Sequence, residues 1–373
     1  MIGKTCLRRL GIGEKKNEEN ELTMAILHYN NIGISALSAC VPSQIEYNKD
    51  LGYFMTEEEI QKAIQNIGIE ERRIAEKDVC SSDLCFKAAE KLLSDYAIDK
   101  HTIDALIFVS QTSDYHQPAT APILQHRLGL SKDTLSFDIN LACSGYVYGL
   151  STAYAYASQA SINRVLLLVG ETMSKIVSRY DKVNTPLFGD AGTATLIEKG
   201  DYGRSVFSLH SDGKGYEVMM VPDGGFRNPT TAESLVEEVD ANGDRRTREQ
   251  FRMDGMAVFN FGMSEEPRDI KNLLAEAGVE LSQLDLLIYH QANKFMTDFF
   301  TKWLKFDKAK TPYSIRKFGN TSSASIPLTI VSELKDNYPE RENVILSGFG
   351  AGLSWGSVLL DLRKCRISDL IEF

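Results

Sequence analysis

Three residues of the sequence combine a reactive or polar side chain with a position just beyond an apolar segment or in a tight turn. Cys143 follows the apolar run 136–141, His290 follows the run 284–289, and Asn320 lies in the turn 319–322. A cysteine thiolate is a strong nucleophile, and a neighbouring histidine is its common partner in enzymes. The sequence therefore indicates covalent catalysis at Cys143, assisted by His290 and Asn320.

The residues around Cys143 predict how it is presented. Residues 136–141 predict a buried strand, and the small residues 146–157 predict a helix in which Gly149 is a weak point. Cys143 then lies at a helix N-terminus, where free N–H groups and the helix dipole favour a thiolate. The alternative is a buried structural cysteine, because free cysteine is among the most buried residue types.

His290 and Asn320 also have alternative interpretations. A histidine at the end of a strand is often a hydrogen-bonded core residue, and an asparagine in a turn is often there because it tolerates the left-handed conformation. An oxyanion intermediate would need fixed N–H donors. The amide of Cys143 and the glycine-rich loop 349–352 are the candidates for these donors.

Length, charge and cysteine content exclude several classes of protein. The 373 residues suffice for two lobes with cores of their own, and the net charge of −10 disfavours global binding to nucleic acid or to an anionic membrane. The longest clean apolar run, residues 165–169, is far too short to cross a bilayer. The six cysteines form no CxxC pair, so we expect no metal site, and a cytoplasmic location is the simpler interpretation.

The order of the predicted elements indicates α/β architecture in two lobes, because strands alternate with helices throughout. Residues 1–23 are polar and charged and are expected to form a disordered extension. The lobes are predicted at 24–205 and 206–373, and the strand 103–108 is echoed by 284–289. The polar stretch 213–249 is interpreted as a surface insertion, since its loop 240–244 matches a calcium-binding loop only in part.

Local signals predict where several elements begin and end. A capping box at 56–59 should start a helix that Gly68 stops. Ser264 is expected to open a helix that ends at Gly278, and residues 355–362 are predicted as the last strand.

Taken together, these segments resemble the thiolase superfamily, and most closely β-ketoacyl-acyl-carrier-protein synthase III. Five segments match the family's motifs in the family's order: 142–145, 188–192, 290–293, 319–327 and 349–356. The resemblance implies a duplicated αβαβα five-layer sandwich, normally a homodimer.

The resemblance also implies a reaction. Cys143 takes an acyl group from a thioester, and His290 and Asn320 bind the malonyl thioester carbonyl and promote decarboxylation. The resulting carbanion attacks the acyl-cysteine. The implied oxyanion donors are Cys143 and Ala351, and the implied partners are an acyl carrier protein with acyl and malonyl thioesters, without a cofactor. The implied substrate-binding residues include Phe349, Gly350 and Gly352.

The chain departs from the family pattern where relatives bind the coenzyme A nucleotide. Lys62 and Asn66 stand where housekeeping members have Trp and Arg, and Lys182 stands near the position of a second Arg. Gln117 stands where an aromatic residue usually crosses the dimer interface to bound the acyl pocket. These changes favour a carrier-protein donor over coenzyme A, and a primer that is polar or longer than acetyl.

A carrier protein is acidic, so docking needs a local basic surface. The segment after His290 offers the lysines 294, 302, 305, 308 and 310, of which we select Lys294, Lys302 and Lys305. The alternative interpretation of these lysines is a solvated helix face.

Two other functions stay open for the protein. One is an acyltransferase that passes the Cys143 acyl group to an alcohol or amine, and the other is a non-catalytic partner subunit that binds acyl thioesters. The primer and the pathway are not determined.

Overall fold

The computed structural model of the chain describes residues 25–373. The expected extension at 1–23 lies outside the described residues. Among residues 25–373, no helix combines the length and apolar character needed to span a bilayer.

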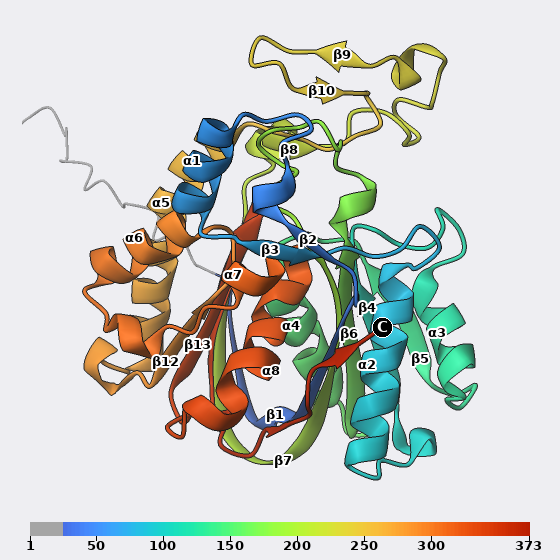
Figure 1. The fold of residues 1–373 in the computed structure, drawn as a ribbon. Coiled ribbons are helices and arrows are strands. Elements are labelled where there is room, and N and C mark those ends of the chain that lie inside the picture. The colour runs from blue at the N-terminus through green and yellow to red at the C-terminus, as the bar shows by residue number, and fades with distance from the viewer. Residues whose placement is uncertain (1–24) are drawn as a thin grey trace, which may run out of the picture.

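The molecule is built of five layers, two sheet layers alternating with three helix layers (Figure 1). Helices α4 (Gly145–Ala157) and α8 (Ser325–Asn337) form the middle layer. Helices α2 (Ser81–Asp95) and α3 (Thr120–Leu128) cover one outer face. Helices α5 (Gly255–Ala277) and α6 (Lys294–Leu304) cover the other. The predicted αβαβα sandwich is confirmed.

The strands pair in the order β12-β13-β14-β7-β6-β4-β5, and β1 pairs with β7. β1 (Ala25–Val41) and β7 (Asp190–Ser211) are long antiparallel strands that pass through both halves. The predicted lobe boundary at 205 falls inside β7, which pairs with both β6 and β14. The shorter strands in this pairing order are β4 (Ala105–Val109), β5 (Leu135–Ile139), β6 (Arg164–Thr172), β12 (Leu286–Tyr289), β13 (Val344–Gly350) and β14 (Ser354–Leu360).

Continuous apolar strands are required because both faces of each sheet are covered. In β4, Ile107 packs into the middle core while its neighbours Leu106 and Phe108 pack under α2 and α3. In β12, Ile288 packs into the same middle core, and Leu287 packs under α5 and α6. Side chains that alternate along a strand therefore pack into cores on opposite faces of the sheet, which gives one middle core and two outer cores.

The similar segments 103–108 and 284–289 occupy equivalent positions in the two halves of the fold. The Asp104 carboxylate accepts hydrogen bonds from the amides of Asn163 and Arg164, at 2.6 and 3.0 Å. The Asp285 carboxylate accepts from the amides of Glu342 and Asn343, at 2.9 and 3.0 Å. Each aspartate precedes the first of two parallel strands and anchors the start of the second, β4 with β6 and β12 with β13.

The capping box at 56–59 is confirmed. Thr56 Oγ1 accepts from the amide of Glu59, whose carboxylate accepts from the amide of Thr56. The resulting helix α1 (Glu57–Ile67) ends at Gly68 in the left-handed conformation. The remaining short elements of the core are β2 (Ile45–Tyr47), β3 (Glu71–Arg73) and α7 (Ile315–Phe318).

Two predicted boundaries are wrong. Helix α5 begins at Gly255, nine residues before Ser264, because the Asp254 side chain accepts from the amide of Ala257 and caps the helix there. Gly278 ends it, as predicted. β14 is not the last strand, since β15 (Arg366–Ile367) and β16 (Ile371–Glu372) follow and pair with β1.

The stretch 213–249 is largely exposed and projects beyond the sandwich, with β9 (Glu238–Val239) and β10 (Arg245–Arg246) at its tip (Figure 1). It also contains β8 (Met219–Met220), which pairs with β11 (Arg252–Met253). In the loop 240–244, the carboxylates of Asp240 and Asp244 bind the Arg246 guanidinium. Within residues 25–373, no cluster of three carboxylate, histidine or cysteine side chains is placed to hold a metal.

Candidate active site

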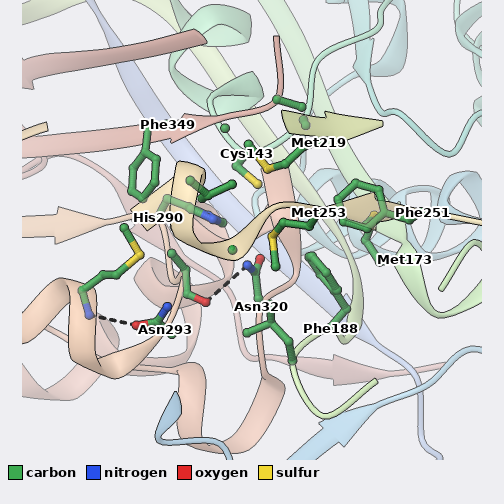
Figure 2. A pocket seen from close by; sticks show the side chains of 18 of the residues that line it. Cys143, Met173, Phe188, Met219, Phe251, Met253, His290, Asn293, Asn320 and Phe349 are labelled. Carbon is green, nitrogen blue, oxygen red and sulfur yellow. Dashed lines mark hydrogen bonds between the residues drawn. The ribbon is translucent and has the colours of Figure 1, made fainter. Parts of the chain in front are cut away.

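Cys143, His290 and Asn320 line one cavity of about 190 Å³. Cys143 lies in the turn between β5 and α4, His290 directly follows β12, and Asn320 lies between α7 and α8. Figure 2 shows the three side chains around the same space, with Met253 beside them. The fold thus brings together three residues that the sequence separates widely.

The cavity wall is mostly apolar. Its methionines come from four separate segments of the chain, and phenylalanine rings fill the spaces between them. The apolar lining consists of Ile67, Ala142, Met173, Val183, Leu187, Phe188, Met219, Phe251, Met253, Val258, Phe259, Ala292, Met296, Phe349 and Ala351. Such a wall excludes water and strengthens electrostatic interactions inside the site.

Cys143 is held as a thiol. Burial raises the pKa of Cys143 to about 12, the nearby Glu171 acts in the same direction, and a hydrogen bond from Ser322 opposes them. The expected preference for the thiolate at a helix start is therefore outweighed by desolvation.

The strand β5, which precedes Cys143 and was predicted to be buried, is only partly buried. It lies at the edge of the sheet, and one of its sides is unpaired.

Two glycines let other segments approach Cys143 and its helix. A Cβ atom on Gly350 would lie 2.6 Å from Cys143 Cβ and 3.1 Å from its amide nitrogen, so the end of β13 can approach the nucleophile this closely only without a side chain. A Cβ on Gly149 would lie 2.9 Å from the Val109 side chain. Gly149 is therefore a close-packing position of α4.

His290 is neutral, and one of its two ring nitrogens contacts a serine hydroxyl. Burial lowers the pKa of His290 to about 3. Its Nδ1 lies 2.7 Å from Ser325 Oγ, and that oxygen already accepts from the amide of Gln291 at 3.2 Å. With the serine donating its proton to Nδ1, the imidazole carries its own proton on Nε2. In that tautomer the Nε2–H is the neutral donor that His290 can offer to a substrate in the cavity it lines.

Asn320 is anchored through its backbone and through one side of its amide. Its N–H donates to the carbonyl of Leu187 at 2.9 Å, and its carbonyl accepts from Gly189 at 3.1 Å. Its Oδ1 accepts from the amide of Ser322 at 2.9 Å, and its Nδ2 donates weakly to the carbonyl of Ala292 at 3.4 Å. One Nδ2 hydrogen is therefore left for a ligand in the cavity.

The other predicted substrate residues divide into two groups. Phe349, Gly350 and Ala351 line the cavity, whereas Gly352, Gln117 and Lys182 are not part of its wall. Gln117 is exposed and forms a cis peptide bond with Pro118. Lys182 Nζ is bound to Glu59 Oε1 at 2.8 Å.

The predicted docking lysines lie on or just after α6, and two of the segment's five lysines share one counter-ion. Lys294 and Lys308 both bind the carboxylate of Asp298. Lys302 is in the last turn of α6, and Lys305 follows it in the left-handed conformation. Both are exposed.

Two polar residues of the site were not identified from the sequence. Ser322 contacts the Cys143 sulfur, and Gln111 contacts Ser322 and lines the cavity. A signal for Gln111 was present, because it follows β4, which is parallel to β5, and the carboxyl ends of parallel strands meet at one edge of the sheet.

Comparison with known proteins places this fold among the thiolase-like condensing enzymes. The 3-oxoacyl-[acyl-carrier-protein] synthase III family model matches residues 137–215, and its C-terminal model matches residues 274–362. A putative 3-oxoacyl-[acyl-carrier-protein] synthase 3 of Campylobacter jejuni is 35% identical over 308 residues, covering 82% of this chain and 86% of the relative.

Two further comparisons cover almost the whole length of the relatives. The β-ketoacyl-[acyl-carrier-protein] synthase III of Fusobacterium nucleatum is 33% identical over 336 residues, covering 88% of this chain and 98% of the relative. The crystal structure of a 3-oxoacyl-(acyl-carrier protein) synthase from Burkholderia xenovorans has a TM-score of 0.88 and 37% identity, covering 94% and 99% of the two chains. The chain belongs to the 3-oxoacyl-[acyl-carrier-protein] synthase III family. It is an acyl-transferring condensing enzyme.

Proposed function

We propose that this enzyme condenses an acyl primer with malonyl-acyl carrier protein, with Cys143 as the covalent nucleophile and His290 and Asn320 as the decarboxylation pair. The observation that carries this assignment is the convergence of the three side chains on one water-excluding cavity. The proposal involves no metal or cofactor, since each step below uses thioester chemistry and the chain's own groups.

In the first half-reaction the Cys143 sulfur attacks the thioester carbonyl of the primer. The C–S bond to the donor breaks, and the donor thiol leaves with the proton that Cys143 gives up. The developing oxyanion needs two N–H donors, and the amides of Cys143 and Ala351 are the candidates at the cavity wall. Gly350 allows this loop to lie against Cys143.

In the second half-reaction the malonyl thioester loses CO2, and the electrons of the broken C–C bond form an enolate. His290 Nε2–H and Asn320 Nδ2–H can donate to the enolate oxygen, where negative charge develops. The enolate carbon attacks the acyl-Cys143 carbonyl, and the Cys143 thiolate leaves. The product is a β-ketoacyl thioester.

The primer is proposed to be apolar and longer than acetyl. The cavity of about 190 Å³ formed within one chain has an almost wholly apolar wall. A dry apolar cavity of about 150 Å³ accommodates a benzene molecule. This favours an acyl chain of several carbons over a polar primer.

The acyl donor is proposed to be a carrier protein. Lys182 is paired with Glu59 and Lys62 with Glu58, so each cation already has a carboxylate that competes with nucleotide phosphates. Lys302 and Lys305 are exposed and available to an acidic partner.

A homodimer is proposed as well. It is supported by the unpaired edge of β5 and by the exposed Gln117 loop, which lies beside the fully exposed ring of Phe226.

The cytoplasm is the proposed location. Cysteines 40, 80, 85, 143 and 365 are all free, which fits a reducing compartment.

Intact-mass measurement after incubation with acyl-coenzyme A and acyl-carrier-protein thioesters tests the assignment, with Cys143→Ala as the control. A mass increase that is absent from the control supports the nucleophile, and malonyl-dependent CO2 release from the acylated enzyme supports condensation. Acylation without CO2 release would instead indicate transfer to an alcohol or amine. No acylation by any donor would favour the partner-subunit function.

A further inference from the structure

The hydroxyl group of Ser322 lies against the sulfur of Cys143. Ser322 is completely buried, and its Oγ is 3.6 Å from Cys143 Sγ. The same oxygen is 2.9 Å from Nε2 of Gln111. These contacts join residues that come from different layers of the fold, at the ends of β4 and β5 and in the turn before α8.

The contacts of Gln111 define the direction of its hydrogen bond to Ser322. Gln111 Nε2 also lies 3.0 Å from the sulfur of Met173, which can only accept, so the amide nitrogen and not its oxygen faces both partners. Ser322 Oγ then accepts from Gln111, and its own proton remains available to donate to Cys143 Sγ. A thiolate at Cys143 can only accept, and Ser322 is oriented to donate to it.

The backbone around Ser322 is held in a conformation that serves this contact. Ser322 has φ +49°, in the left-handed region that a residue with a side chain rarely adopts. Its amide donates to Asn320 Oδ1 at 2.9 Å, and the hydroxyl of the next residue, Ser323, donates to Glu171 Oε1 at 2.8 Å. Glu171 also accepts from the amide of Gln111, so one buried carboxyl group holds both Gln111 and the residue next to Ser322.

We propose that Ser322 is a catalytic hydrogen-bond donor that stabilises the Cys143 thiolate, and that Gln111 is a positioning residue that directs the Ser322 hydroxyl to the sulfur. This inference rests on the proposed role of Cys143 as the nucleophile. The titratable groups that face Cys143 make such a donor necessary. His290 is neutral, and Glu171 is either protonated and uncharged or, when ionised, disfavours a negative sulfur, so neither of them stabilises the thiolate.

The left-handed backbone of Ser322 offers a way to separate the hydroxyl group from the fold. Ser322→Gly removes the hydroxyl and relaxes the backbone, whereas Ser322→Ala removes the hydroxyl and keeps the strain. A role of the hydroxyl group predicts the same effect in both variants, and a role of the backbone predicts opposite effects. Gln111→Met keeps the length of the side chain but removes the donor, and should give a smaller effect in the same direction.

The experiment measures the rate at which iodoacetamide alkylates Cys143, followed by peptide mass, between pH 5.5 and 7.5. Glu171 stays largely protonated in this range, because burial raises its pKa to about 8. Loss of one hydrogen bond to the thiolate should raise the thiol pKa by about one unit. Because a more basic thiolate is also more nucleophilic, the net alkylation rate should fall about threefold at every pH.

The matched control is Ser151→Ala, which removes a buried serine hydroxyl from α4 that donates to the carbonyl of Tyr148 and does not contact the sulfur. It should leave the alkylation rate unchanged. Wild-type rates in both Ser322 variants, or a slowing confined to Ser322→Ala, would overturn the proposal. Alkylation needs no acyl donor, so a wild-type protein that is alkylated but never acylated would refute the proposed function and not the hydrogen bond.

Discussion

Replacing Gly350 by alanine should displace the nucleophile without removing any polar group. The added Cβ would lie 2.6 Å from Cys143 Cβ and 3.2 Å from its sulfur, whereas ordinary contacts begin at 3.4 Å. Relieving the closest contact therefore requires a movement of about 0.8 Å between the loop and Cys143, from the difference between 3.4 and 2.6 Å. Reacting groups misplaced by about 1 Å lose on the order of 10²-fold in rate.

We therefore expect Gly350→Ala to slow acylation of Cys143 by about 10²-fold. The assay is rapid quenching of the enzyme with its best acyl donor, followed by intact mass, so that acylation is observed apart from condensation. Thermal unfolding of the same variant separates displacement from loss of folding. Overpacking of this kind usually costs about 1–3 kcal/mol of stability.

Gly213→Ala is the matched control, because a Cβ at that position meets no heavy atom within 4 Å and the residue lies outside the site. It should acylate within about twofold of the wild-type rate. A folded Gly350→Ala variant that acylates as fast as Gly213→Ala would refute the conclusion that close contact between this loop and Cys143 positions the sulfur.

Three further predictions follow from the buried groups. Asn320→Asp keeps the side-chain oxygen that accepts from the Ser322 amide but removes the Nδ2–H donor. The rate of malonyl-dependent CO2 release by acylated enzyme should therefore fall about 10²–10³-fold, and the rate of Cys143 acylation should fall less. Equal losses in the two rates would contradict this role of Asn320. Because burial lowers the pKa of His290 to about 3, the imidazole stays neutral above that pH, and the CO2-release rate should show no inflection near pH 6.5; an inflection there would contradict a neutral donor. Burial raises the pKa of Glu266 to about 8, so the folded state keeps a proton that the unfolded state releases above about pH 4.5, and this contribution to stability is lost as the pH rises through 8. Denaturant titrations between pH 5.5 and 7.5 should therefore show the free energy of unfolding of wild type decreasing more steeply with pH than that of Glu266→Gln, by up to about 1.4 kcal/mol per pH unit. The control Glu265→Gln changes a more exposed neighbour and should behave as wild type. Parallel curves for wild type and Glu266→Gln would refute the prediction.

Local physics explains what could be read from the sequence. The capping box at 56–59, the left-handed end of α1 at Gly68 and the apolar strands around residues 105 and 286 depend on neighbours in the chain or on a simple alternation of side chains. The positions of Cys143 and His290 beyond strand ends were visible for the same reason. The start of α5 at Gly255 was missed because its cap at Asp254 lies within a polar stretch that predicts loop.

The tertiary structure alone decided the electrostatics and the partners of the site. The helix start at Cys143 favours a thiolate locally, yet burial raises the thiol pKa, because desolvation depends on all the segments that surround the sulfur. Lys182 is occupied by Glu59, which lies 123 positions away in the chain. The contact between Gln111 and Ser322 joins residues 211 positions apart, and that between Cys143 and Ser322 joins residues 179 apart. No local pattern encodes such pairs, because they exist only once parallel strands and the middle helices bring their ends to one edge of the sheet.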